Sequence, residues 1–214
     1  MDTTQSRAYR SPRRQAQAEA TRAAIVRAAG RLFAERGYAG TTMQAIADEA
    51  GVAVESVYKA GSKAQLLRRA HEEAVVGDDR PIALYDRDEV RAALAVDDQR
   101  ELIREFARTI ADRARTLTPI SRAFVQAAGA DAVINESWEE LEEQRLTDLR
   151  RLVESVAALG PLRDGLSVEH GGTLLWTVLN HHAGWLVAHH LRWDDKQVAD
   201  WMAELITCLL LPTA

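Results

Sequence analysis

The sequence of 214 residues is poor in the features that mark secreted and membrane proteins. Its single cysteine, Cys208, cannot form a disulfide within the chain, which favours a reducing compartment. No apolar run reaches the roughly 18 residues that a membrane span needs. The N-terminus is polar and contains arginines, unlike a secretory signal. We therefore expect a cytoplasmic protein without a membrane segment.

Motifs of the common enzyme classes are also missing. The sequence has no nucleophile elbow, no glycine-rich phosphate loop and no H-E-x-x-H pair. We therefore expect no catalytic site and no cofactor. No segment reads as a strand, whereas apolar residues recur at helical spacing along most of the chain. The expected fold is all-α, with about nine helices.

Charge is distributed unevenly along the chain. Residues 1–70 hold 12 Lys and Arg against 6 Asp and Glu, whereas the remaining residues hold 15 against 26. Phosphate contacts supply most of the non-specific affinity for DNA. A basic first third therefore suits nucleic-acid binding by that third alone, because the acidic remainder would be repelled by a duplex.

Residues 41–67 read as two short helices joined by a tight turn, followed by the start of another helix. Thr41 and Gln44 have the spacing of a capping box. An apolar stripe follows, formed by Met43, Ile46, Ala47 and Ala50. Gly51 allows the left-handed backbone that ends a helix. This pattern predicts a helix-turn-helix, whose second helix enters the major groove of DNA. An ordinary corner between two helices is the alternative.

The second helix of this motif is expected at about residues 53–59. Its apolar anchors are Val52, Val54 and Val57, and its outward surface carries Ala53, Glu55, Ser56 and Lys59. Ser62 and Gln65 repeat the capping-box spacing and begin a further helix that runs from residue 63 to about residue 76.

A helix is expected just upstream, over about residues 18–36, and it ends at Gly37. The run 24–38 and the segments 41–47, 50–52, 57–58 and 62–63 together closely resemble the DNA-binding domain of tetracycline-repressor-like (TetR family) regulators. One departure lies between Tyr58 and Ser62, where the Phe of the family pattern is missing and the segment is one residue short. The helix expected at 53–59 must therefore end earlier, or the core must lose one buried side chain.

The resemblance implies a sequence-specific transcriptional repressor that a small molecule releases from its operator. Thr42, Tyr58 and Lys63 would contact phosphates. Glu55, Ser56 and Lys59 would read base edges. The predicted DNA-binding residues are Thr42, Ala53, Glu55, Ser56, Tyr58, Lys59 and Lys63.

Three parts are expected along the chain. Residues 1–18 form a basic flexible arm, which either follows the DNA or is a solubilising tail. Residues 19–62 form the helix-turn-helix domain, and residues 63–214 form a ligand-binding and dimerisation domain. In the last part we expect helices at 88–96, 100–117, 118–128, 135–159, 168–191 and 195–210.

The final helix pair is apolar over more than one face. The resemblance implies that it packs against a second copy of the chain, so that a homodimer binds a palindromic operator in double-stranded DNA. Burial within one subunit is the alternative. The predicted interface residues are Leu174, Val178, Trp185, Val198, Trp201, Met202, Leu205 and Leu209.

A pocket for an unidentified small-molecule effector is expected among the helices at about 100–190, again from the resemblance. Aromatic side chains line such pockets, although each one could instead pack in the core. The predicted lining residues are Phe106, Phe124, Trp138, Trp176 and His182.

Histidine pairs near the C-terminus suggest a second class of function, a helical metal-dependent enzyme or metal sensor. The pairs are His181–His182 and His189–His190. Metal-binding histidines on one helix are usually four residues apart, and zinc would need further ligands, so we predict no metal site. A helix-turn-helix used for contact with another protein is a third hypothesis.

Overall fold

The computed structural model describes residues 12–77 and 88–213, and all regular elements in these ranges are helical. They are α1 (Pro12–Gly40), α2 (Met43–Ala50), α3 (Val54–Ala60), α4 (Lys63–Val76), α5 (Asp88–Leu94), α6 (Gln99–Ala128), α7 (Ala132–Leu159), α8 (Val168–Val178), α9 (His181–Trp185), the π-helical turn η2 (Leu186–His190) and α10 (Asp195–Leu210). The all-α prediction is confirmed. None of these helices is long and apolar enough to cross a membrane.

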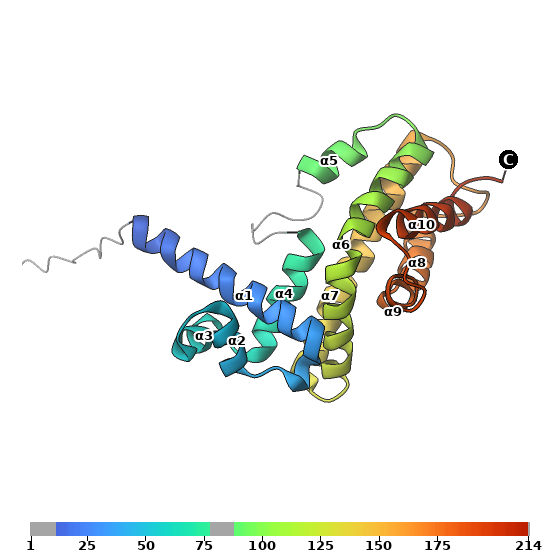
Figure 1. The fold of residues 1–214 in the computed structure, drawn as a ribbon. Helices are drawn as coiled ribbons and strands as arrows, with labels where there is room; N and C mark the ends of the chain where they lie inside the picture. Colours follow the sequence, from blue (N-terminus) through green and yellow to red (C-terminus); the bar gives the residue numbers. More distant parts are fainter. Residues whose placement is uncertain (1–11, 78–87, 214) are drawn as a thin grey trace, which may run out of the picture.

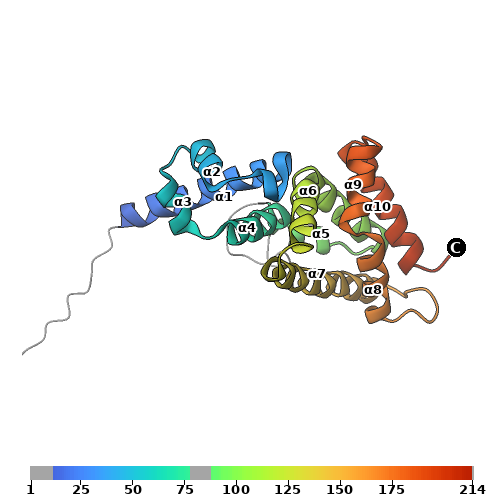
Figure 2. The ribbon, with the colours of Figure 1, turned by 90° about the horizontal axis from the view of Figure 1, so that it is seen from below.

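The helices α1 to α4 gather at one end of the molecule and α8 to α10 at the other, with the long helices α6 and α7 between them (Figures 1 and 2). One buried cluster joins α1–α4 to the C-terminal half of α6 and to the start of α7, where Phe124 and Ile134 belong to the same core as Phe33. A second cluster joins the first half of α6 to α7, α8 and α10. The N-terminal helices therefore share their core with α6.

Several helix ends follow the local rules read from the sequence. Gly51 has the left-handed backbone (φ 66°, ψ 35°) that ends α2. Ser62 and Gln65 form the expected capping box, with N–H···O distances of 3.2 and 2.9 Å. Asp194 and Gln197 form a second one before α10. These caps satisfy backbone donors that the first turn of a helix leaves unpaired.

The predicted capping box at Thr41 and Gln44 is wrong. The neighbouring residue, Thr42, caps α2, and its hydroxyl accepts a hydrogen bond from the backbone N–H of Ala45 at 3.1 Å. Thr41 is buried instead, and its hydroxyl donates to the carbonyl of Gly37 at 2.9 Å. Two adjacent threonines offer the same capping chemistry, and the burial of one of them decides which caps the helix.

The boundary predicted for the N-terminal arm is wrong for residues 12–18, because α1 already begins at Pro12. Proline suits the first position of a helix, because a backbone N–H at that position has no hydrogen-bond acceptor within the helix. Residues 1–11 of the predicted arm lie outside the described residues.

The break predicted between helices at residues 117 and 118 does not exist. Pro119 lies inside α6, which continues to Ala128. Proline removes one backbone donor, at a substantial cost in stability. The helix continues because both halves bury apolar faces, the first against α7 and α10 and the second against α1 and α4.

The single helix predicted at 168–191 is interrupted. α8 ends at Val178, and Asn180 caps α9, accepting hydrogen bonds from the backbone N–H groups of His182 and Ala183 at 2.9 and 3.0 Å. Asparagine competes with the helical backbone in this way, which apolar periodicity does not reveal. The chain then passes through the π-helical turn, in which Leu191 N–H donates to the carbonyl of Leu186 at 2.8 Å.

Candidate functional site

The described residues hold two candidate sites, a helix-turn-helix surface and a cavity on the far side of α4. In the helix-turn-helix, α2 and α3 pack against each other, and Ala47 is completely buried together with Ile46 and Val57. The turn is closed by a 3.0 Å hydrogen bond from Val52 N–H to the carbonyl of Ala47. The predicted helix-turn-helix geometry is therefore present.

The outward face of α3 carries the residues predicted to touch DNA. Glu55, Tyr58 and Lys59 are exposed, and the Tyr58 side chain is 64 % exposed although it is large. Ser56 is half-buried, and Ala53 is exposed at the N-terminal end of the helix. The structure thus brings these residues together on one accessible surface, where their contacts with DNA remain predictions.

Thr42 and Lys63, the predicted phosphate contacts outside α3, stand at the beginnings of α2 and α4. Thr42 is exposed. The ammonium of Lys63 lies 4.2 Å from the ring centroid of Tyr38, and partial burial lowers the pKa of Lys63. A cation held over an aromatic face is more ordered than a free surface lysine.

In the shortened segment after Tyr58, α3 ends at Ala60 and the chain turns at Gly61. Ala60 ends α3 and is buried in the core shared with α1 and α4. Gly61 turns the chain with φ 151°, a conformation that favours glycine. The guanidinium of Arg69 donates to the carbonyl of Ala60 at 2.6 Å. Arg69 thereby satisfies a carbonyl at the end of α3 and ties α3 to α4.

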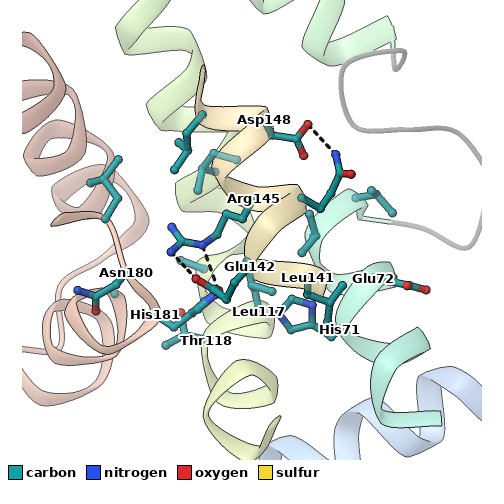
Figure 3. A pocket seen from close by; sticks show the side chains of 18 of the residues that line it. His71, Glu72, Leu117, Thr118, Leu141, Glu142, Arg145, Asp148, Asn180 and His181 are labelled. Atoms are coloured by element: carbon teal, nitrogen blue, oxygen red, sulfur yellow. Dashed lines mark hydrogen bonds and ion pairs between the residues drawn. The ribbon is translucent and has the colours of Figure 1, made fainter. Parts of the chain in front are cut away.

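A cavity of about 660 Å³ lies between α4, α6, α7, α10 and the segment around α9 (Figure 3). This volume falls within the range of about 300–1,000 Å³ that holds drug-sized ligands. Apolar residues form much of the wall, among them Phe106, Ile110, Leu117, Val198, Trp201 and Met202. Charged and polar residues from α4, α7 and α9 complete it, so the cavity suits an amphipathic molecule.

A polar cluster occupies the α7 side of the cavity. Arg145 donates to both carboxylate oxygens of Glu142, at 3.2 and 2.7 Å, and to the carbonyl of Trp176 at 3.1 Å. His181 Nε2 lies 3.0 Å from Glu142 Oε1. Burial raises the pKa of Glu142, but the hydrogen bonds from His181 and Arg145 outweigh burial and lower that pKa to about 2. Glu142 is therefore ionised and fully engaged at neutral pH.

His71 lies on the α4 side of the cavity and is almost fully buried. Burial, helped by the nearby His181, lowers the pKa of His71 to about 3, so the ring is neutral. The Ser121 hydroxyl donates to the carbonyl of Leu117 at 3.0 Å, so His71 Nε2, 3.1 Å from that hydroxyl, is the donor. His71 Nδ1 is then an acceptor, and it is buried without a hydrogen-bond partner among the described residues.

The predicted pocket residues divide into those that line the cavity and those that lie elsewhere. Only Phe106 is among the lining residues. Phe124 and Trp138 pack behind the wall, with ring centroids 5.7 and 5.6 Å from that of His71. Trp176 lies behind Arg145, with its ring centroid 5.4 Å from the guanidinium carbon. His182 is exposed and stacks on Trp185 outside the cavity.

The sequence reasoning missed the polar wall, namely His71, Glu142, Arg145 and His181. One signal was available. Arg145 falls on the apolar stripe of α7 between Leu141 and Leu149, at helical spacing, and its partner Glu142 is three residues away. A charged pair that interrupts an apolar stripe indicates a polar site within the core.

The predicted interface residues also divide into two groups. Val198 and Met202 are 3 % and 7 % exposed and line the cavity, so the prediction that they face a second copy is wrong. Apolar periodicity cannot separate a face buried in the subunit from one covered by a partner. The half-buried residues outside the cavity remain available for an interface: Leu174, Val178, Trp185, Leu205 and Leu209. Trp201 is half-buried but lines the cavity.

Comparisons with known proteins agree with this architecture. Residues 25–70 match the family model described as bacterial regulatory proteins, tetR family. No curated protein sequence matches the chain. A TetR-family transcriptional regulator from Mesorhizobium loti has 16 % identity and a TM-score of 0.66, with 90 % of this chain and 96 % of that chain covered.

Two ligand complexes share the fold. A transcriptional regulator from Saccharomonospora viridis in complex with choline has 16 % identity and a TM-score of 0.66, covering 90 % of this chain and 98 % of that chain. The regulator FadR from Bacillus subtilis in complex with stearoyl-CoA has 17 % identity and a TM-score of 0.64, covering 86 % and 96 %. At such identities the likeness establishes the fold.

Proposed function

We propose that this chain is a ligand-responsive, sequence-specific transcriptional regulator, because its residues 25–70 match the model of the tetR family of bacterial regulatory proteins. It represses by binding an operator and is released from it by a small molecule. One observation carries the proposal: α4 lines the cavity with Arg68, His71 and Glu72 and also holds the end of α3 through Arg69. The two candidate sites thus share one helix.

The DNA-binding half of the proposal uses the surface of α3 and the starts of α2 and α4. Glu55, Ser56 and Lys59 read base edges in the major groove. Thr42, Tyr58 and Lys63 contact phosphates, which fixes the register of the protein on the duplex. The basic character of residues 1–70 supports this assignment. Residues 19–62 are the DNA-binding domain, and residues 63–214 bind the ligand and the second subunit.

The ligand-responsive half depends on differential affinity. A ligand releases the protein from DNA only if it binds more tightly to a conformation whose α3 does not fit the operator than to the operator-binding conformation. A molecule in the cavity contacts α4 at Arg68, His71 and Glu72. A shift of α4 moves Arg69 and therefore the carbonyl end of α3. The coupling requires no separate pathway, because a single helix carries both contacts.

A homodimer on a palindromic operator completes the proposal. A single helix-turn-helix reads few base pairs, and two copies add specificity when they lie one or more helical turns apart. The half-buried Leu174, Val178 and Leu205 belong to none of the three buried clusters of the described residues. Such apolar residues on neighbouring helices fit a face that a second copy covers. This regulator works in the cytoplasm, where bacterial DNA lies.

The metal-dependent alternative finds no support in the placement of the histidines. His181 pairs with Glu142, whereas His182, His189 and His190 surround Trp185 with ring centroids 6.2–6.5 Å away. Across residues 12–77 and 88–213, no group of three His, Cys, Asp or Glu side chains is positioned to hold a metal ion.

Binding of the purified protein to its own upstream DNA tests the proposal, measured across a salt series with competitor DNA. Tight binding at a palindrome that resists competitor supports the regulator. Weak, salt-sensitive binding to every duplex contradicts it, because phosphate attraction alone carries no sequence information.

A further inference from the structure

The cavity wall has an excess of negative charge. Four carboxylates line it, Glu72, Glu140, Glu142 and Asp148, against two guanidiniums, Arg68 and Arg145. His71 is neutral at physiological pH because burial lowers its pKa. His181 shares the Glu142 carboxylate, and Arg151, which is not a lining residue, lies 4.0 Å from Asp148.

Both guanidiniums on the wall already have anionic partners. Arg68 forms ion pairs with Glu72 and Glu140. Arg145 forms a two-point hydrogen-bonded pair with Glu142 and also binds the carbonyl of Trp176. An anionic ligand would have to compete with these pairs, and removing an arginine from its carboxylate leaves that carboxylate in a partly buried site without its counter-charge.

Two features of the wall favour a ligand that donates hydrogen bonds and carries positive charge. His71 Nδ1 is a buried acceptor that lacks a partner in the described part of the chain. Asp148 is half-buried, accepts a hydrogen bond from the neutral amide of Gln144 at 3.1 Å, and has Arg151 Nη1 at 4.0 Å. Burial raises the pKa of Asp148, so a cation nearby would stabilise its charged form.

The rest of the wall accepts an apolar body. Phe106, Leu117 and Trp201 come from α6 and α10 and belong to the apolar part of the wall. Aromatic rings also attract cations. From the charge excess, the engaged arginines, the unpartnered acceptor on His71 and the apolar wall, we propose that the effector is an amphipathic cation, an apolar body carrying a protonated amine. This inference names the ligand class of the proposed regulator and rests on that function.

Three probes with one apolar body test the ligand class. They are 4-biphenylmethylamine, 4-biphenylmethanol and 4-biphenylcarboxylate, measured by titration calorimetry on the full chain near neutral pH and without DNA. The amine should bind about tenfold more tightly than the alcohol, and the carboxylate should bind most weakly. Equal affinities, a preference for the carboxylate, or no binding of the amine would overturn the proposal.

Substitutions of cavity residues test which carboxylates cause the preference for the amine. Glu142→Gln removes the anion that engages Arg145 and His181, so the carboxylate probe should gain affinity and the amine should lose it. Asp148→Asn should shrink the advantage of the amine and serves as the test if the first variant does not fold. Glu143→Gln, an exposed neighbour outside the cavity, is the matched control and should change neither probe. Amine selectivity that survives in both cavity variants would contradict the assignment.

Two further measurements separate this inference from the proposed function. Ala114→Phe fills the cavity with a large side chain and should abolish binding of the amine. Retained binding would place the amine elsewhere and overturn the inference. Operator binding is measured separately, with and without the amine. If the protein binds its operator but not the amine, only the proposed ligand class is refuted. If it binds the amine but no operator, the proposed regulator function is refuted.

Discussion

Arg69 and Ala60 join α4, which lines the cavity, to the end of α3, the helix proposed to enter the major groove. The Arg69 guanidinium donates a 2.6 Å hydrogen bond to the carbonyl of Ala60, the last residue of α3. The adjacent Arg68 lines the cavity on the same helix. This contact holds the C-terminal end of α3 to α4.

Removal of this contact should weaken operator binding without removing a phosphate contact. We expect Arg69→Ala to reduce operator affinity about fivefold, which corresponds to about 1 kcal/mol for one charged hydrogen bond. The salt dependence of binding should stay unchanged, because α3 is loosened while the phosphate contacts remain. Fluorescence anisotropy with labelled operator across a salt series measures both quantities.

A matched substitution separates the contact from the loss of charge. Arg104→Ala removes an exposed arginine on α6, away from the helix-turn-helix, and should leave operator affinity unchanged. If Arg69→Ala lowers the slope of log K against log salt by about one, Arg69 contacts a phosphate and the structural role is refuted.

Lys63 should contribute affinity that does not depend on DNA sequence. Its ammonium is held over the Tyr38 ring at the start of α4. We expect Lys63→Ala to weaken binding to operator and random duplexes alike and to lower the salt slope by about one. Lys59→Ala, on the outward face of α3, should instead change the preference among operator sequences. Binding to a panel of operator variants at several salt concentrations distinguishes the two effects.

The lysine on α10 provides the control for charge. Lys196 is exposed and pairs with Asp200, and Lys196→Ala should change neither affinity nor salt slope. Wild-type affinity of Lys63→Ala at every salt concentration would refute its assignment as a phosphate contact.

Local chemistry made the helix-turn-helix predictable from the sequence. Gly51 and the pair Ser62–Gln65 cap helices through hydrogen bonds to residues no more than two helical turns away. The structure has both caps at the positions that the sequence predicts. The breaks in the C-terminal region depend on packing over longer distances. Pro119 is tolerated because both halves of α6 are buried, and Asn180 interrupts a run whose apolar spacing looks continuous.

The cavity was harder to predict because its polar residues come from separate helices. His71 on α4 meets Ser121 on α6, 50 positions later, and His181 meets Glu142 across 39 positions. No spacing rule joins residues so distant in sequence. The predicted range of about 100–190 holds the walls from α6, α7 and α9, whereas α4 and α10 also line the cavity and lie outside that range. Which face of each helix turns inward depends on contacts between helices, which sequence spacing does not reveal.

The neutral His71 should make stability depend on pH. Its pKa is about 3 in the folded state because of burial, against about 6.5 in an unfolded chain. As pH falls below about 6.5, the unfolded state binds a proton that the folded state does not, so the folded state loses stability in this window. We expect this residue to remove about 2 kcal/mol from the free energy of unfolding between about pH 7 and pH 5. Urea denaturation at both pH values measures the loss.

His71→Phe keeps an aromatic ring in the core but cannot titrate, so that variant should lose less stability over the same interval. The exposed His190 provides the comparison, since His190→Phe should retain the full pH dependence of the wild-type chain. Identical pH dependence in wild type and His71→Phe would show that folding does not lower the pKa of His71.

A charge placed on the proposed dimer face should separate the subunits. Leu205 is half-buried on α10 and lies outside the three buried clusters, so Leu205→Glu leaves the core of the subunit intact. Burying an unpaired carboxylate against a second copy should weaken the dimer roughly 100-fold or more. Sedimentation velocity should then show a monomer, and affinity for a palindrome should fall toward that for a half-site. Val133→Glu introduces the same charge at a residue 69 % exposed on α7 and should leave the dimer intact. An undiminished dimer in Leu205→Glu would place the interface on another face of the molecule.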